Sequence, residues 1–324
     1  MSKLIAVTGA TGQQGGSVVE YLLEYPETFT IRAITRNPES TSAKNLTAKC
    51  VEVVKADLSN LDEVISAFAG AWGVFAVTQF YEHGYDLEQL HGKNMVEAAK
   101  INDVKHFVWS TVEGREGECK AISWTSKARI EDLVVESGIP WTFVYIPMYY
   151  ENFFTPFFPP SYDPEKGFSW SVPVPSEAPI YSMSVEDFGG WPSGWVVPAF
   201  REPEKYAGVK VKICVEYLSM RDIVQQFSEV TGEKAYLGLE LDTTQFEATR
   251  YGDHPLAETL YLSWEFVLRS GPGSGVKSTE QTMRIHPNAR TYRQWLKESQ
   301  TMKDYVKKVK DEAVAKKGTS QVHL

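Results

Sequence analysis

The chain has 324 residues, of which 43% are hydrophobic and 23% are charged, and this composition excludes the intrinsically disordered class of proteins. Its length exceeds that of one usual compact core, so we expect a large domain with a smaller one attached. The formal net charge of −9 at pH 7 argues against direct binding to nucleic acid.

The three cysteines, Cys50, Cys119 and Cys214, are far apart in the sequence. An odd number at these spacings fits neither a disulfide framework nor a four-ligand zinc site, so we predict no metal. The apolar run Leu4–Val7 is too short for the core of a signal peptide, and no run approaches the length of a membrane span. We therefore expect no membrane association and a reducing compartment, which is the cytoplasm or also the nucleus.

The first 146 residues alternate short β-branched runs with amphipathic helical patterns. This alternation is typical of a parallel sheet covered by helices on both faces, and it predicts an α/β fold of the doubly wound Rossmann type. The predicted strands are Leu4–Val7, Thr30–Thr35, Val51–Lys55, Val74–Val77, Phe107–Ser110 and Thr142–Ile146.

After Pro147 the pattern changes to an aromatic stretch, Tyr149–Trp170, in which frequent prolines exclude a long helix or an inner strand. Further predicted elements are a strand over Val209–Val215, a helix capped by Ser219 and Asp222, and a helix over Ala257–Leu268.

These patterns predict three parts. Residues 1–150 form the Rossmann domain, with segments that return from the C-terminal part of the chain. Residues 151–300 form a smaller α/β domain that binds a substrate or a partner. Residues 301–324, rich in alternating Lys and Asp or Glu, form a charged helix or tail.

A glycine-rich turn, Gly9-Ala10-Thr11-Gly12-Gln13-Gln14-Gly15-Gly16, follows the first strand and opens a helix. In this context Gly9 permits a tight turn, Gly12 permits close approach of a pyrophosphate, and Gly15 permits close helix packing. The spacing G-x-x-G-x-x-G favours the short-chain reductases. The predicted cofactor contacts in this turn are Gly9, Thr11, Gly12, Gln13, Gln14 and Gly15.

The end of the second strand decides which ribose is bound. A carboxylate there would bind the 2′-hydroxyl of NAD, whereas this chain has Arg36, whose guanidinium can pair with a 2′-phosphate. We therefore predict NADP(H) as the preferred cofactor and NAD(H) as a possible one, although Glu39 weakens the positive field of Arg36. Asp57 either contacts the adenine amino group or caps the next helix, and Leu58, which follows it, is also predicted as a cofactor contact.

With these motifs in hand, the chain resembles the NmrA-like family of atypical short-chain reductases over residues 1–300. The segments that carry the resemblance, besides the glycine turn, are Thr35–Pro38, Val77–Phe80, Tyr149–Phe153, Met183–Asp187 and Asn288–Leu296. The resemblance implies a cleft between two domains. It also implies that Thr78, Gln79 and Phe80 line the nicotinamide end, and that Tyr149 and Asn152 add cofactor contacts.

Short-chain reductases use a Tyr-x-x-x-Lys pair, in which the lysine helps the tyrosine to donate a proton. Here Lys127 is present, but Ser123 stands in the place of the tyrosine. Lys127 could still hold the nicotinamide ribose, and Ser110 could hydrogen-bond a carbonyl. The missing acid would come from Lys127, Tyr149, or the polar loop after the fourth strand, which carries Tyr81, His83 and Tyr85.

Two functions therefore stay open. In the first, the chain is an oxidoreductase, lacking the usual tyrosine, that acts on a small aromatic or polycyclic molecule in biosynthetic tailoring. In the second, which the resemblance also implies, it is a redox sensor that binds the cofactor without turnover and regulates transcription through a protein partner. The aromatic stretch, with Trp124, Trp191, Trp195 and Trp264, forms either a substrate wall, a partner surface, or a core between domains.

Overall fold

The computed structural model describes residues 2–115, 117–155, 157–190, 194–251 and 256–320, and these form two compact units. The N-terminal unit comprises Met1–Ile146, Val185–Ile213 and Ser278–Ala289. The C-terminal unit comprises Pro147–Ser184, Cys214–Lys277 and Arg290–Leu324. Among the described helices, none is both long and apolar enough to cross a bilayer.

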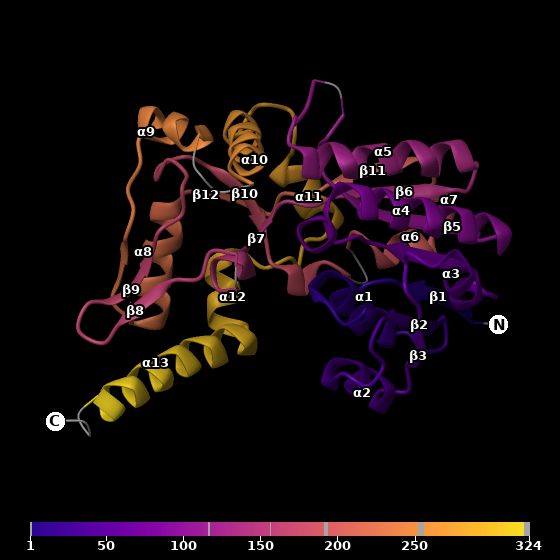
Figure 1. The fold of residues 1–324 in the computed structure, drawn as a ribbon, viewed down its shortest axis with the longest axis horizontal. Coiled ribbons are helices and arrows are strands. Elements are labelled where there is room, and N and C mark those ends of the chain that lie inside the picture. Colours follow the sequence, from indigo (N-terminus) through magenta and orange to yellow (C-terminus); the bar gives the residue numbers. More distant parts are fainter. Residues whose placement is uncertain (1, 116, 156, 191–193, 252–255, 321–324) are drawn as a thin grey trace. The chain divides into compact units, whose positions relative to one another are not determined.

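The N-terminal unit contains a seven-stranded sheet in the order β11-β6-β5-β4-β1-β2-β3, with every neighbouring pair parallel. The strands are β1 (Lys3–Val7), β2 (Phe29–Thr35), β3 (Glu52–Lys55), β4 (Gly73–Ala76), β5 (His106–Thr111), β6 (Trp141–Tyr145) and β11 (Val209–Lys212) (Figure 1). The strand order reverses between β1 and β4, as it does in doubly wound sheets. The predicted fold class is confirmed.

Helices cover both faces of this sheet because the residues of its strands are apolar on both sides. Val74 and Ala76 of β4 belong to a buried cluster with α3, α4 and α5, whereas the alternate residue Phe75 packs edge-on against Phe188. The helices of this unit are α1 (Gln13–Leu23), α2 (Thr41–Ala48), α3 (Leu61–Phe68), α4 (Phe80–Ile101), α5 (Ile122–Ser137), α6 (Val197–Arg201), α7 (Pro203–Tyr206), α11 (Thr279–Ile285) and the 3-10 turn η2 (Val185–Asp187).

Two predictions about this unit were wrong. The strand predicted at Val209–Val215 is β11, which pairs with β6 in the Rossmann sheet and not within the C-terminal domain where we expected it. An apolar run predicts a strand but does not identify the sheet that it joins. The segment Tyr81–Asp86, expected as a loop, lies in α4, whose helical geometry is interrupted at Gly84 (φ 72°).

The C-terminal unit holds two small mixed sheets, of order β12-β10-β7 and β13-β9-β8. The capped helix α8 begins after Ser219, which forms a capping box with Asp222 as predicted, and the helix expected over Ala257–Leu268 is α10. The elements are β7 (Met148–Tyr149), η1 (Tyr150–Phe153), β8 (Ser161–Asp163), β9 (Gly167–Trp170), β10 (Ile180–Met183), β12 (Glu216–Leu218), α8 (Met220–Thr231), β13 (Ala235–Leu237), α9 (Thr243–Ala248), η3 (Thr249–Tyr251), α10 (Ala257–Arg269), α12 (Tyr292–Glu298) and α13 (Gln300–Ser320).

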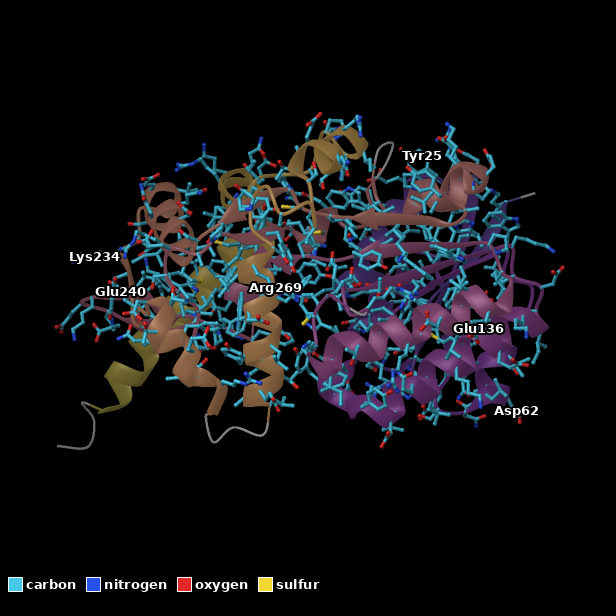
Figure 2. The ribbon with its side chains drawn as sticks, turned by 90° about the horizontal axis from the view of Figure 1, so that it is seen from above. Tyr25, Asp62, Glu136, Lys234, Glu240 and Arg269 are labelled. Carbon is cyan, nitrogen blue, oxygen red and sulfur yellow. The ribbon has the colours of Figure 1, made fainter. Side chains whose placement is uncertain are left out.

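The aromatic stretch forms the core of the C-terminal unit. The ring of Phe154 lies 5.7 Å from that of Trp170, 5.8 Å from Phe227 and 5.6 Å from Trp295. All four side chains are buried, so they hold this unit together, whereas Phe157 of the same stretch is 55% exposed. Trp191 lies outside the described residues. Lys234 and Glu240, labelled in Figure 2, are exposed charged residues of this unit.

A buried histidine makes the stability of the N-terminal unit sensitive to acid. His106 at the start of β5 is fully buried, and its Nε2 lies 2.8 Å from Oγ1 of Thr142. Burial, with a smaller effect of nearby Lys3, lowers the pKa of His106 from 6.5 to about 4. The unfolded chain therefore takes up this proton at a higher pH than the folded chain does.

We expect acidification from pH 7 to pH 5 to remove about 2 kcal/mol of stability through this group, because protonation in that range occurs only in the unfolded chain. His106→Leu should lack this part of the pH dependence. Urea unfolding of both proteins at the two pH values measures the difference. Equal pH dependence would show that His106 is not buried in its neutral form.

Candidate functional site

The glycine turn leaves no room for side chains. Gly9 follows β1 in the left-handed region (φ 60°), which favours glycine, and a Cβ atom there would lie 2.9 Å from Cγ1 of Val77. A Cβ atom on Gly15 would lie 2.3 Å from the carbonyl oxygen of Gly9. Helix α1 therefore begins directly against the turn, and only glycine at these positions allows it.

The start of α1 fits the pyrophosphate that we predicted there. Gly12 is the N-cap residue and offers no side-chain cap, and the first turn carries no acidic residue. The first N–H groups of a helix have no hydrogen-bond partner within that helix. At the start of α1, Thr11, Gly12 and Gln13 are exposed, so a ligand can reach these groups. Gln14 connects the turn to the end of β5, since its Oε1 accepts a hydrogen bond of 2.5 Å from Oγ of Ser110.

Arg36 lies directly after β2, as predicted, but its guanidinium is already paired. Its Nη2 lies 2.5 Å from Oε1 of Glu82 in the first turn of α4. Hydrogen bonding to Arg36 lowers the pKa of Glu82, so the carboxylate is ionised at neutral pH. Glu39, expected to weaken the field of Arg36, is instead paired with Lys44 at 3.0 Å. We did not predict this ion pair, because Glu82 lies on an element that is distant from Arg36 in the sequence.

Asp57 does not cap the helix that follows it. The N-cap of α3 is Asn60, whose Oδ1 accepts from the backbone of Asp62 and Glu63. Oδ1 of Asp57 accepts a 2.8 Å hydrogen bond from the backbone of Ser59, and this bond is the main reason why the pKa of Asp57 is lowered. The capping alternative was therefore wrong. Adenine contact stays a prediction for Asp57 and for Leu58, whose half-buried side chain packs against the core cluster.

Lys127 is the counter-ion of a buried carboxylate. Its Nζ lies 2.9 Å from Oε1 of Glu88 and 3.0 Å from Oγ1 of Thr78, which itself donates to Glu88 at 2.6 Å. Glu88 is fully buried, and the side chain of Lys127 is 13% exposed. Lys127 therefore holds in place Thr78, the first of the three residues predicted at the nicotinamide end.

We did not predict Glu88 as part of the site. Its position in the helical repeat places it on the buried face of α4, where a carboxylate needs a buried cation, and the sequence does not show that Lys127 supplies it. Of its neighbours in the predicted site, Gln79 is the N-cap residue of α4, and the ring of the buried Phe80 lies 5.6 Å from that of Tyr81. The three predicted residues thus stand at the junction of β4 and α4, on the same edge of the sheet as the glycine turn.

The other predicted catalytic residues have different environments. Ser110 is buried, whereas the ring of Tyr81 is 48% exposed. His83 packs edge-on against His91 at 4.9 Å, and its Nε2 lies 3.8 Å from Oε2 of Glu82. These residues all belong to the N-terminal unit.

Tyr149 and Asn152 belong to the C-terminal unit, so their cofactor and catalytic roles stay predictions. The hydroxyl of Tyr149 is buried, and burial raises the pKa of Tyr149 well above its usual value. Nδ2 of Asn152 lies 3.1 Å from Sδ of Met148.

Comparison with known proteins places the chain in a family. The model of the NmrA-like family matches residues 1–239. The NmrA-like oxidoreductase FrzB of Cladobotryum sp is 34% identical over 257 residues, which is 72% of this chain and 75% of that protein. The oxidoreductase ptmS of Penicillium ochrochloron is 32% identical over 72% of this chain and 74% of its own. The chain belongs to the NmrA-like family, as its resemblance predicted.

Solved structures share the fold at lower identity. The negative transcriptional regulator NmrA, solved with NAD, has a TM-score of 0.74 at 21% identity and covers 93% of this chain and 96% of its own. The triphenylmethane reductase of Citrobacter sp, solved with NADP(H), has a TM-score of 0.66 at 20% identity and covers 92% of this chain and 99% of its own.

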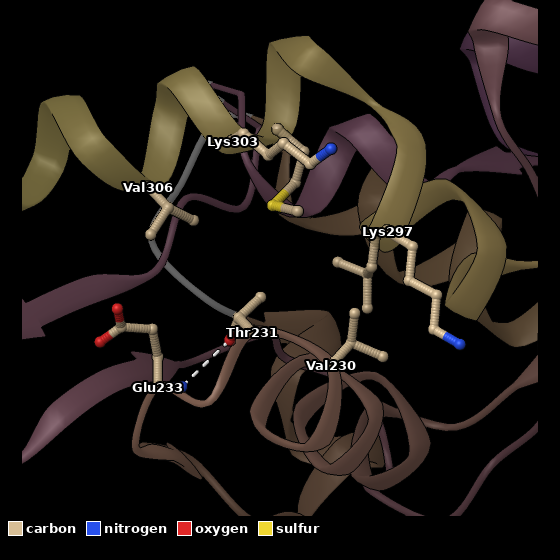
Figure 3. Close-up of a pocket in the computed structure, with 8 residues that line it drawn as sticks. Val230, Thr231, Glu233, Lys297, Lys303 and Val306 are labelled. Carbon is tan, nitrogen blue, oxygen red and sulfur yellow. Dashed lines mark hydrogen bonds between the residues drawn. The ribbon is translucent and has the colours of Figure 1, made fainter.

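One groove of about 340 Å³ lies within the C-terminal unit, among α8, α12 and α13 (Figure 3). Apolar side chains such as Val230 and Val306 line it together with Lys297, Lys303 and Glu233. It contains none of the predicted cofactor or catalytic residues.

Gly15→Ala should both destabilise the protein, by about 2 kcal/mol, and weaken cofactor binding, because the new Cβ atom must displace α1 from the turn. Gly16→Ala is the matched control, since its Cβ atom would lie 3.7 Å from the nearest oxygen, that of Ala10. Thermal unfolding and titration with NADP⁺ measure both effects. Identical behaviour of the two variants would contradict the tight contact at Gly15.

Lys127→Met should cost about 3 kcal/mol of stability, because it leaves the carboxylate of Glu88 buried without a counter-ion. The double variant Lys127→Met with Glu88→Gln should recover most of this loss, since no unpaired charge remains. Urea unfolding of the single and double variants tests the pair. A single variant as stable as the natural chain would show that Glu88 does not depend on Lys127.

Proposed function

We propose that this protein is an oxidoreductase of a small organic molecule that uses NADP(H) in preference to NAD(H). The observation that carries the proposal is the open start of α1 on a turn that only glycine can form, with Arg36 at the end of the neighbouring strand β2. Relatives above 30% identity, over about three quarters of their length, are named oxidoreductases, which supports the same activity here.

The residues of the chain would bind and orient the two ends of the dinucleotide. The backbone N–H groups of Gln13 and Gln14 at the start of α1 hold the pyrophosphate, and Arg36 pairs with the 2′-phosphate. Thr78 lies at the nicotinamide end, and Lys127 acts through it as a positioning residue. The nicotinamide, when bound, supplies or accepts the hydride.

Reduction of a substrate also requires a proton donor, and we propose that this donor lies at the start of α4. Ser110 already donates to Gln14, and the raised pKa of Tyr149 makes it a poor acid. Tyr81, with its exposed ring, and His83, on the same helical turn, are the better candidates.

The proposed substrate is an aromatic or polycyclic compound with a carbonyl or imine group. The support for it is the exposed side chain of Tyr81 beside Phe80, and not the rings of Phe154 and Trp170 in the aromatic stretch, which are buried. Biosynthetic tailoring is the role that such a substrate would fit.

The alternative function is a redox sensor that binds the cofactor without turnover and acts on a protein partner. The observation that favours it is Ser123, which is buried in the place where short-chain reductases carry their tyrosine. Lys127, bound to Glu88, completes no acid–base pair with it.

Titration calorimetry with NADPH, NADP⁺, NADH and NAD⁺, followed by absorbance assays with aromatic carbonyl and imine compounds, tests the proposal. We expect Arg36→Ala to weaken NADP(H) binding by about tenfold or more and to leave NAD(H) binding little changed, because a charged hydrogen bond is lost only with the phosphate. Oxidation of NADPH by a member of the panel supports the enzyme. Binding without any turnover favours the sensor, and no binding at all contradicts both.

A further inference from the structure

We propose that Glu82 is a specificity-determining residue that competes with the 2′-phosphate of NADP(H) for Arg36 and binds the 2′-hydroxyl of NAD(H). The inference rests on the proposed function and deepens it, because it assigns to one ion pair the recognition of both cofactors. It follows from the place of the pair, from its exposure and from the groups around it.

The ion pair between Arg36 and Glu82 brings a carboxylate to the end of β2, where the strand itself is followed by an arginine and not by an acidic residue. Dinucleotide-binding sheets that prefer NAD carry a carboxylate at the end of the second strand, which accepts a hydrogen bond from the 2′-hydroxyl. Here Arg36 occupies that position, and the carboxylate of Glu82 reaches it from the start of α4, with Nη2 and Oε1 2.5 Å apart. Both of the groups that can distinguish the two riboses are therefore present at the end of β2.

The pair can open at little cost. The side chains of Arg36 and Glu82 are 57% and 48% exposed, so each can turn into solvent. An exposed ion pair of this kind contributes little to stability, so water can replace either partner. A phosphate carries about −1.5 to −2 charges and three acceptor oxygens, so Arg36 pairs with it more strongly than with a carboxylate.

Two histidines lie beside the carboxylate of Glu82. Oε2 of Glu82 lies 3.8 Å from Nε2 of His83, whose ring packs against that of His91, and Nε2 of His91 lies 2.8 Å from Oγ of Ser59. Asp57, on the same edge of the sheet, has its pKa lowered in part by Arg36. Glu82 is thus ionised and directed at the guanidinium, and opening the pair costs NADP(H) a part of its affinity.

Glu39 is a matched control for Glu82. It follows the same strand and has an exposed side chain, but it pairs with Lys44 and not with Arg36. Glu39→Gln therefore removes the same charge from the same end of the sheet without touching the proposed device.

The experiment measures the dissociation constants of 2′,5′-ADP and NAD⁺ for the full chain and for Glu82→Gln, Glu39→Gln and Arg36→Ala. We expect Glu82→Gln to tighten 2′,5′-ADP binding about two- to fivefold, because Arg36 is released, and to weaken NAD⁺ binding severalfold, because the 2′-hydroxyl loses its acceptor. Glu39→Gln should change either constant by less than about twofold, since the charge that it removes is exposed and paired with Lys44 and not with Arg36.

The outcomes separate this inference from the proposed function. If Arg36→Ala abolishes 2′,5′-ADP binding while Glu82→Gln leaves both constants unchanged, the role of Glu82 is overturned and the proposed function stands. If Glu82→Gln and Glu39→Gln tighten 2′,5′-ADP equally, the effect is one of net charge, and the inference is again overturned. If the natural chain binds neither ligand, both the inference and the proposed function fail.

Discussion

The contact between Gly15 and the carbonyl group of Gly9 is the constraint on which the rest of the site depends. A Cβ atom at position 15 would lie only 2.3 Å from the carbonyl oxygen of Gly9, so the absence of a side chain there lets α1 begin immediately after β1. The same turn is connected to the next two strands on one side of β1, because Thr8 accepts a hydrogen bond from the backbone after β4 and Gln14 accepts one from Ser110 on β5. The carboxyl ends of the central strands are thereby held around the positive end of a helix.

Two glutamates on α4 show how burial decides what a charge can do. Glu88 is fully buried against Lys127, and separating that pair would leave a charge without solvent or counter-ion, so it serves as a fixed part of the structure. Glu82 is half exposed against Arg36, and water can replace either partner. The same residue type on the same helix is therefore rigid at one position and adjustable at the other.

The parts of the site that lie close together in the sequence were predictable from it, and the parts that come together only by folding were not. The six predicted strands agree with the observed ones to within about one residue at each end, because alternation of β-branched runs and helices determines them locally. The glycine turn and Arg36 were predicted for the same reason. The partners Glu82 and Glu88, and the place of β11 in the sheet, depend on contacts between distant segments, for which a single sequence carries no periodic signal.

The residues proposed for cofactor recognition and those proposed for proton transfer both lie at the start of α4. Gly84 interrupts the helix, so Phe80–His83 forms a single turn that is not continuous with the rest of α4. That turn carries Glu82, whose carboxylate is paired with Arg36. Its two neighbours in the sequence are Tyr81, which is exposed, and His83. A change in the pairing of Glu82 therefore acts on the same turn that holds both candidate proton donors. With the roles proposed for Glu82, Tyr81 and His83, the choice of cofactor and the capacity for proton transfer are for that reason not independent properties.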